Sequence, residues 1–480
     1  MNYPLIQRVV GLMLVFFGLT IIFPIIISLV NDDGNIGSFL FSLLITILAG
    51  LFLYLPNKKC SNDIKTKEGF LIVVLFWVVL SAFASIPFIL DPYLQMSFAD
   101  AFFESVSGWT TTGATVINNL DSLPMSILMY RQQLQWLGGM GIVILVLAIL
   151  PILGVGGMQL YKAESTGPIK DNKISPKITE TAKNLWSVYL GLTFVCALLY
   201  YFAGMSAFDA IAHSFSTIAI GGFSTHNESI GYFNNIYIEV ICMTFMLLSA
   251  MNFVLHFMSL KTKSIRHYLE DSELKSYISI ILIFIIFIFL HSLLSNNNET
   301  SFRHIVFQII SFITTSGFTT ADYSIWPSFI FTMLILMSFI GACAGSTGGG
   351  IKVMRILLIL KLTKKELLKI IHPSAEIPIR INNTPLSDDI APNVWNFFIL
   401  YVISYLVISF VLLAGGLDLT TAFSAVASCM NNLGPALGDV ANTYSSLGSF
   451  EKYILAFAML LGRLELLTLL IVFTPYFWKY

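Results

Sequence analysis

Four short runs rich in Gly, Thr, Ser and Asn recur along this sequence, and their regularity suggests a shared site. The runs align without gaps on the glycines Gly113, Gly222, Gly317 and Gly434. Six residues before each glycine stands a serine, at Ser107, Ser216, Ser311 and Ser428. The residues beside the glycines differ widely in side chain. What the four runs share is therefore a backbone and not a set of reactive groups.

The chemistry that such a backbone supports is the binding of a cation by main-chain carbonyl oxygens. A strand that aims successive carbonyls at one axis must visit positive φ, which glycine adopts without a Cβ penalty. Rings of carbonyls can then replace the hydration shell of an ion. The alternative is that these glycines only turn the chain. The predicted binding residues are Thr111, Thr112, Gly113, Ile220, Gly221, Gly222, Thr315, Ser316, Gly317, Asn432, Leu433 and Gly434.

A further glycine-rich segment, 341–350, contains five glycines in ten residues. Each glycine inside a helix costs up to about 1 kcal/mol, so we expect this segment to break into a loop, and we favour a mobile gate over a static bend. The spacing of a phosphate-binding GxxxxGK[ST] loop is not met. The predicted gate residues are Gly345, Ser346, Thr347, Gly348, Gly349, Gly350, Lys352 and the distant Arg463. For Arg463 the alternative is a structural ion pair between helices.

An acidic residue follows each of the four runs, at Asp121, Glu228, Asp322 and Asp439. These carboxylates could concentrate cations at the mouth of a pore. They could equally be ordinary solvated loop residues, and the sequence favours neither interpretation.

The composition shows what kind of elements must position these residues. Of 480 residues, 56% are hydrophobic and only 11% are charged, whereas soluble proteins carry roughly a quarter charged residues. The chain is therefore expected to be embedded in a lipid bilayer. A net charge of −1 argues against a nucleic-acid partner. The five Cys and seven His show no metal-ligand spacing and no nucleophile motif, so an enzyme is not expected.

A bilayer core about 30 Å thick needs roughly 20 apolar residues in a helix. Stretches of that length without Asp, Glu, Lys or Arg are 9–31, 34–57, 69–90, 132–161, 184–208, 240–260, 276–298, 323–351 and 390–417. A tenth, 453–474, contains only Arg463 and Glu465. We interpret 9–31 as a retained span, because its apolar region is too long for a signal peptide.

The four runs lie in shorter charge-poor stretches, 105–120, 210–227, 304–321 and 419–438. Irregular backbone at membrane depth is tolerated only where protein buries it or water lines it, so we predict re-entrant loops here. The expected fold is an all-α integral membrane protein with ten transmembrane helices and four re-entrant pore loops around one central pore. With cytoplasmic N- and C-termini, 22 of the 26 Lys and Arg face the cytoplasm.

The alignment of the runs also divides the chain into repeats. Residues 1–66 form two leading transmembrane helices. Four pseudo-symmetric helix-loop-helix repeats follow, at 67–165, 166–268, 269–375 and 376–480, and the third contains the broken inner helix.

These motifs resemble the membrane subunit of the Trk/Ktr/HKT potassium-transporter superfamily, of the TrkH type. The matching segments are TTTGAT (110–115), AIGGFST (219–225), TTSGFTT (314–320), NNLGPALG (431–438) and AGSTGGGIK (344–352). The resemblance covers essentially the whole chain, and the two leading helices favour the Trk branch over Ktr. Ala436, where many relatives have glycine, is a small departure.

The resemblance implies potassium uptake across a bacterial inner membrane, with K+ as the transported ion. It also implies a homodimer, one pore per protomer, and a cytosolic TrkA-like nucleotide-binding regulatory subunit. The family gate falls on 341–350, with Arg463 as its arginine. In related plant proteins a serine at the first filter glycine accompanies sodium preference, so Gly113 implies potassium. Channel-like and ion-coupled flux both stay open, and the alternative function is an ion-coupled secondary transporter of another small solute.

Overall fold

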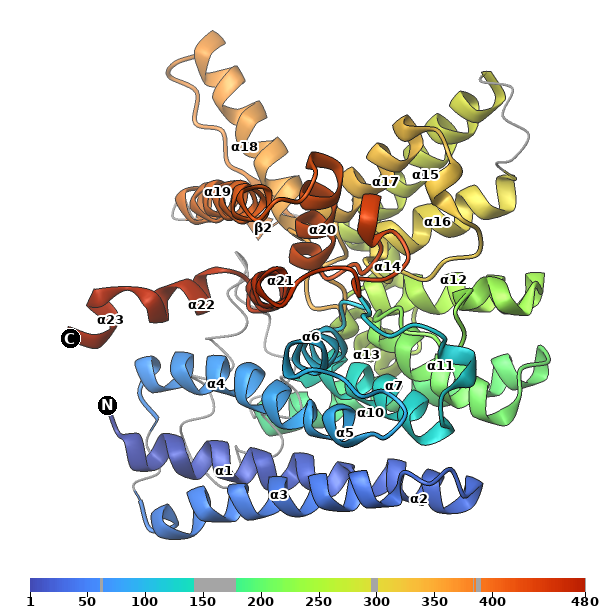
Figure 1. Ribbon diagram of the computed structural model, residues 1–480. Coiled ribbons are helices and arrows are strands. Elements are labelled where there is room, and N and C mark those ends of the chain that lie inside the picture. Colours follow the sequence, from blue (N-terminus) through green and yellow to red (C-terminus); the bar gives the residue numbers. More distant parts are fainter. Residues whose placement is uncertain (61–63, 142–177, 295–300, 383, 386–389, 480) are drawn as a thin grey trace.

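The computed structural model describes residues 1–60, 64–141, 178–294, 301–382, 384–385 and 390–479 (Figure 1). The regular elements in this part of the chain are helices, apart from an antiparallel pair of two-residue strands, β1 (Arg380–Ile381) and β2 (Thr384–Pro385). The segment before the first glycine run contains α1 (Tyr3–Thr20), α2 (Ile22–Asn31), α3 (Ile36–Tyr54), η1 (Leu55–Asn57), α4 (Thr66–Ala84) and α5 (Ile86–Leu90).

A short α-helix, a short 3-10 helix (η) and a further α-helix then recur in this order around each glycine run. The first run has α6 (Phe98–Trp109), η2 (Leu120–Ser122) and α7 (Met125–Gly139). The second has α10 (Ile178–Phe202), α11 (Ala207–Ala219), η3 (Ser229–Phe233), α12 (Ile236–Ala250), α13 (Phe253–Thr262) and α14 (Arg266–Glu270). The third has α15 (Ser272–Leu294), α16 (Phe302–Thr314), η4 (Tyr323–Ile325), α17 (Ser328–Ile340) and α18 (Val353–Ile371). The fourth has α19 (Ile390–Ala414), α20 (Leu419–Asn431), η5 (Gly438–Val440), α21 (Ser449–Arg463), α22 (Leu467–Leu470), η6 (Ile471–Phe473) and α23 (Pro475–Lys479).

Six helices of the described residues are long and apolar enough to cross a membrane, at Tyr3–Asn31, Ile36–Asn57, Thr66–Leu90, Ala182–Phe202, Ser272–Leu294 and Pro392–Ala414. Two bent pairs, α12 with α13 and α21 with α22 and η6, raise the number to eight if each is one span. The all-helical membrane class is confirmed. The count of ten stays a prediction, because 132–161 extends beyond residue 141 and so partly outside the described residues.

Several expected spans are not continuous helices. The stretch 240–260 bends by 95° between α12 and α13, and 453–474 bends by 113° after α21. In 323–351 the helix α17 stops at Ile340, and a loop runs from there to α18. The glycines predicted this last break. The other two bends carry no comparable glycine signal.

The helices before each glycine run, α6, α11, α16 and α20, have only 12 or 13 residues. At 1.5 Å per residue such helices are about 20 Å long, too short for a bilayer core of about 30 Å. Two of them begin with one sequence pattern, since Ser97 accepts a hydrogen bond from the N–H of Asp100 and Ser206 accepts one from Asp209. These serines satisfy a free N–H of the first turn.

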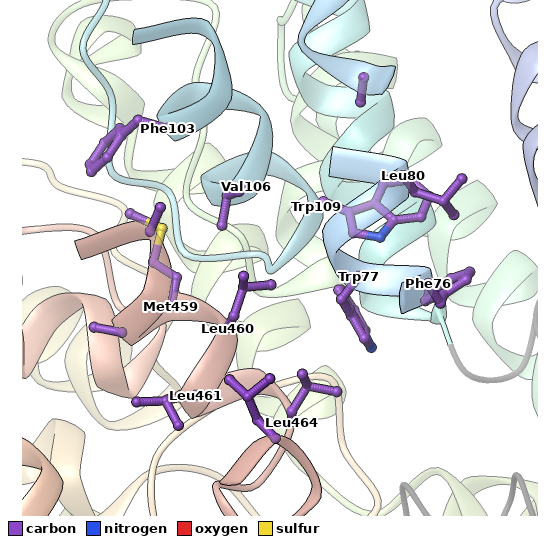
Figure 2. Packing of buried hydrophobic residues seen from close by; sticks show 14 of the residues in the cluster. Phe76, Trp77, Leu80, Phe103, Val106, Trp109, Met459, Leu460, Leu461 and Leu464 are labelled. Atoms are coloured by element: carbon purple, nitrogen blue, oxygen red, sulfur yellow. The ribbon is translucent and has the colours of Figure 1, made fainter. Parts of the chain in front are cut away.

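Behind the first short helix lies a packed apolar core. Figure 2 shows side chains of α4, α6 and α21 gathered around the end of α6, with Trp109 beside Trp77 and Phe76. The ring centroids of Trp77 and Trp109 are 6.3 Å apart, and those of Phe76 and Trp109 are 5.7 Å apart. This core joins the first run to the last helix pair and fixes where α6 ends.

Candidate functional site

The four glycine runs follow one backbone path. The residue two places before each aligned glycine is left-handed, with φ of 55° at Thr111, 54° at Ile220, 63° at Thr315 and 55° at Asn432. The aligned glycines also have positive φ, of 84° at Gly113, 78° at Gly222, 82° at Gly317 and 95° at Gly434. Each short helix therefore ends in the same turn, although the side chains in the four turns differ.

The hydrogen bonds of this turn repeat as closely as its dihedral angles. In each run the N–H directly before the glycine donates to the carbonyl of the aligned serine, at 2.8–2.9 Å. The N–H of the left-handed residue donates to the carbonyl three residues before it, at 3.1–3.2 Å. Together these two bonds form a Schellman cap, which closes the last carbonyls of a helix and reverses the chain. All four serines are fully buried within this turn.

The four glycines meet in a closed ring. A Cβ built on any of them would lie against the carbonyl oxygen that precedes the glycine of the next run. For Gly113, Gly222, Gly317 and Gly434 in turn, these carbonyls belong to Gly221, Ser316, Leu433 and Thr112. The last contact, from the fourth run to the first, closes the cycle. No side chain fits at these positions unless a neighbouring carbonyl moves.

The twelve predicted binding residues, three from each run, therefore lie together. Four of their main-chain oxygens face the aligned glycine of a neighbouring run. Rings of carbonyl dipoles can replace the water around a cation and carry no formal charge themselves. The four short helices also direct their C-terminal ends to the ring, where the helix dipole favours a cation. Because these groups carry no formal charge, the ring is suited to a cation of low charge.

A buried ion pair supports the first run from outside the ring. The Arg131 Nε lies 2.8 Å from Glu104 Oε1, and both side chains are almost fully buried. Glu104 also accepts hydrogen bonds from Thr115 Oγ1 and from the N–H of Val116. Arg131 reaches the second run, where it donates to the carbonyl of Ser224 at 3.1 Å. Sequence reasoning missed this pair, although two lone charges beside charge-poor stretches were a signal for it.

Two amide side chains hold further parts of the ring. Gln135 Nε2 donates to the carbonyl of Gly221 at 2.6 Å, and its Oε1 accepts the N–H of Phe223 at 3.1 Å. Asn432 Nδ2 donates to Thr112 Oγ1 and to the carbonyl of Met459, both at 3.0 Å. Gln135 thus holds one ring oxygen, and Asn432 joins the fourth run to the first run and to α21. Sequence reasoning singled out Asn432 but not Gln135.

The glycine-rich segment 341–350 lies against the C-terminal ends of three of the short helices, α11, α16 and α20. The N–H of Gly349 donates to Thr315 Oγ1 at 2.7 Å, and Thr347 Oγ1 donates to the carbonyl of Ile218 at 3.1 Å. A Cβ built on Gly349 would collide with the carbonyl oxygen of Asn431. Lys352 Nζ donates back to the carbonyl of Gly348, which folds the loop on itself.

Arg463 joins this loop to the remaining run. Its guanidinium donates to the carbonyl of Thr347 at 2.9 Å and to Thr111 Oγ1 at 3.2 Å. It also donates to the carbonyl of Gly138 at 2.8 Å, at the end of α7. The predicted gate residues therefore lie together, directly beside the predicted binding residues. The nearby Glu465 pairs with Arg355, at 2.5 Å.

The four acids beyond the runs do not share one environment. Asp121 accepts hydrogen bonds from His226 at 2.6 Å and from Asn227 Nδ2 at 2.7 Å, so it joins the outer loops of the first two runs. Burial alone would lower the pKa of His226, but its contacts with the carboxylates of Asp209 and Asp121 raise it. Asp322 accepts the N–H of Ser324, as in an ordinary turn. The structure thus brings Asp121 into an interaction between runs and leaves Asp322 in a local turn.

The chain is similar to known proteins over its whole length. The profile of a family described as "TrkH: Cation transport protein" matches residues 36–480. The chain is 50% identical over 481 residues to the Trk system potassium uptake protein TrkH of Halomonas elongata, with all of both chains covered. It is 47% identical over 483 residues to the protein of the same name from Escherichia coli K12, again with full coverage of both.

A solved structure resembles the chain over its whole length. This is the crystal structure of the potassium transporter TrkH from Vibrio parahaemolyticus, with a TM-score of 0.90 and 44% sequence identity. The match covers 100% of both chains.

Proposed function

The chain belongs to the TrkH family of cation transport proteins, and from this premise we propose that it takes up potassium ions through the ring of four glycine runs. It is a transporter and not an enzyme, and K+ is its transported ion. The observation that carries the proposal is the closed cycle in which each aligned glycine faces the carbonyl of the next run. Such a cycle gives the main-chain oxygens a common axis, as a selectivity filter requires.

The proposed binding residues are the three residues of each run that end at its aligned glycine. The proposed barrier is the segment Gly345 to Gly350, together with Lys352 and Arg463. Its support is its position, because it contacts Thr315, Ile218 and, through Arg463, Thr111. A loop that is bonded to the glycine runs directly beside the filter is suited to block an ion there. Its glycines allow it to move.

The proposed topology has ten spans and four re-entrant pore loops, divided into repeats at 67–165, 166–268, 269–375 and 376–480. The helices α6, α11, α16 and α20 support it, because each is too short to cross a bilayer and each ends at the ring. Both chain termini lie on one side of the molecule (Figure 1). In the proposed topology 22 of the 26 Lys and Arg lie on the side that carries the termini, and we assign this side to the cytoplasm of a bacterial inner membrane.

We further propose that the protein is a homodimer and that a cytosolic TrkA-like nucleotide-binding subunit docks on its basic inner face. Lys361, Lys364, Lys365 and Lys369 of α18 contribute to that face. Figure 1 shows α18 extending away from the rest of the fold, where a partner can reach it.

The proposal is tested by ion flux into proteoliposomes that contain the purified protein. Potassium, rubidium, sodium and lithium are compared at equal gradients, with empty liposomes as the control. We expect potassium and rubidium to enter faster than sodium and lithium, because the ring is built for a weakly hydrated ion. Equal rates for all four ions would overturn the filter, and no flux of any cation would overturn the function.

A further inference from the structure

A buried carboxylate binds both ends of the glycine-rich loop. Glu273 lies in the first turn of α15, and its side chain is only 2% exposed. Its Oε1 atom accepts the N–H of Ala344 at 2.7 Å and the N–H of Met354 at 3.1 Å. Ala344 stands directly before the segment 345–352, and Met354 stands just after it. One oxygen atom of Glu273 therefore joins the two ends of the loop.

This arrangement is specific to the loop and is not a cap of the helix that carries it. Capping carboxylates accept N–H groups from the first turn of their own helix, whereas Glu273 accepts two from a distant segment. Burying a carboxylate is costly unless hydrogen bonds replace its water, and here those bonds come from the loop. If the loop moved away, the side chain of Glu273 would stay buried without these hydrogen bonds. Glu273 therefore favours the closed arrangement of the loop.

The residues just before Glu273 are in turn held by the β1–β2 turn. Asn382 Oδ1 accepts the N–H of Ser272 at 2.8 Å, and its Nδ2 donates to Asp271 Oδ2 at 3.1 Å. Asn382 is exposed and left-handed, with φ of 47°. This turn follows the basic helix α18, on the face where we place the cytosolic partner. The side chain of Asn382 thus joins an accessible turn to the start of α15.

We propose that Glu273 is a positioning residue that locks the glycine loop across the filter, and that Asn382 determines where Glu273 stands. A partner that moves the β1–β2 turn would shift the start of α15 and weaken both bonds to the loop. The proposal rests on the gate assigned under the proposed function, and it adds the contact that releases that gate.

The test measures basal rubidium flux for Glu273→Ala and Glu273→Gln in proteoliposomes. We expect a rise of about tenfold or more for Glu273→Ala, since both hydrogen bonds from the loop to this side chain are lost. Glu273→Gln keeps the accepting oxygen, so its flux should stay near the wild-type value. Glu68→Ala is the matched control, because Glu68 is equally buried in a first helix turn and accepts the N–H of Asn2 and of Lys65. A rise in Glu68→Ala equal to that in Glu273→Ala would overturn the proposal.

A second measurement reports on the loop without relying on flux. Cys343 directly precedes Ala344, whose N–H is bonded to Glu273. Its side chain is 1% exposed, so a maleimide should label it slowly. In a Cys60→Ser background, which removes the one cysteine that is not buried, labelling should accelerate in Glu273→Ala and not in Glu68→Ala. Unchanged labelling in Glu273→Ala would overturn the proposal.

The role of Asn382 is tested with Asn382→Gly, which keeps the left-handed backbone and removes both side-chain bonds. Its flux should rise, and it should add nothing when combined with Glu273→Ala. Full additivity would overturn the link. Deleting 346–349 in the same assay separates the two levels of the proposal. If the deletion raises basal flux and Glu273→Ala does not, the role proposed for Glu273 is wrong and the gate stands. If neither change raises the flux, the gate itself is wrong.

Discussion

The substitution Gly113→Ser separates the two reasons for a glycine in the filter. Gly113 has φ of 84°, and a Cβ there would collide with the carbonyl oxygen of Gly221. Gly204, in the turn before α11, has φ of 106°, but a Cβ there would meet nothing within 4 Å. Both substitutions place a side chain in the left-handed region, which costs about 1–2 kcal/mol. Only Gly113→Ser must also displace a carbonyl of the ring.

The size of the effect follows from that carbonyl. Losing one contact between a cation and a backbone dipole is comparable to losing a charge-assisted hydrogen bond, at about 1.5–3 kcal/mol. If the potassium-bound state carries this loss and the sodium-bound state does not, the preference for potassium falls by roughly tenfold to hundredfold. The expected direction is relatively more sodium entry in Gly113→Ser. Gly204→Ser should lose stability to a similar degree and keep its ion preference.

The assay is the ratio of rubidium to sodium flux in proteoliposomes for the wild type, Gly113→Ser and Gly204→Ser. The ring also predicts a ranking, because the Cβ on Gly434 would lie 2.7 Å from the carbonyl oxygen of Thr112, the longest of the four closest contacts. Gly434→Ser should therefore change the ratio least among the four filter glycines. An unchanged ratio in Gly113→Ser, or an equal change in Gly204→Ser, would refute the reasoning.

Other contacts give further expected outcomes. Arg463→Ala removes the bonds from the guanidinium to the loop and to the first run, so basal rubidium flux should rise, and an unaltered flux would contradict a gating role. Glu104→Ala leaves Arg131 buried without its carboxylate, which should cost about 3–5 kcal/mol and lower the thermal unfolding midpoint in detergent; an unshifted midpoint would count against this pair as a support of the filter. The raised pKa of His226 means that its contribution to stability is complete below its ordinary value of about 6.5 and is lost as pH rises through the raised value. The unfolding midpoint should fall over that pH range in the wild type, and His226→Asn should remove this dependence.

Much of the glycine ring that we propose as the filter could be predicted from the sequence, because its main constraint is steric. Where four segments of the chain approach so closely that no Cβ fits, only glycine can be accommodated. The aligned glycines in the sequence indicate that requirement directly. The left-handed residues before them could not be predicted in this way. Thr111, Ile220 and Thr315 are β-branched, and local preference keeps such residues out of positive φ. The closed ring and the Schellman caps impose that conformation, and neither is a local property of the sequence.

The bend between α12 and α13 was likewise hidden from the sequence. It lies at Met251 and Asn252, where no glycine stands, and its physical reason is the loop that docks there. The carbonyl of Ala250 accepts the N–H of Cys343 at 3.0 Å, and the N–H of Phe253 donates to the carbonyl of Gly345 at 3.0 Å. Breaking the helix frees these backbone groups, and the glycine loop satisfies them. A contact between segments about ninety residues apart thus determines the break.

The bonds between the glycine loop and the runs imply that, in the proposed mechanism, opening the gate also affects the filter. Thr111 and Thr315 belong to the first and third runs, and their hydroxyls are bonded to Arg463 and to the N–H of Gly349. The loop cannot leave the inner end of the path without breaking the bond to Thr315. The bond of Arg463 to the carbonyl of Thr347 must break as well, which frees the guanidinium that also holds Thr111. Each filter residue so released is left-handed and strained, so an open gate removes part of what keeps the ring carbonyls in place. In the proposed mechanism, the open state of the gate is therefore also the state in which the ring is least constrained.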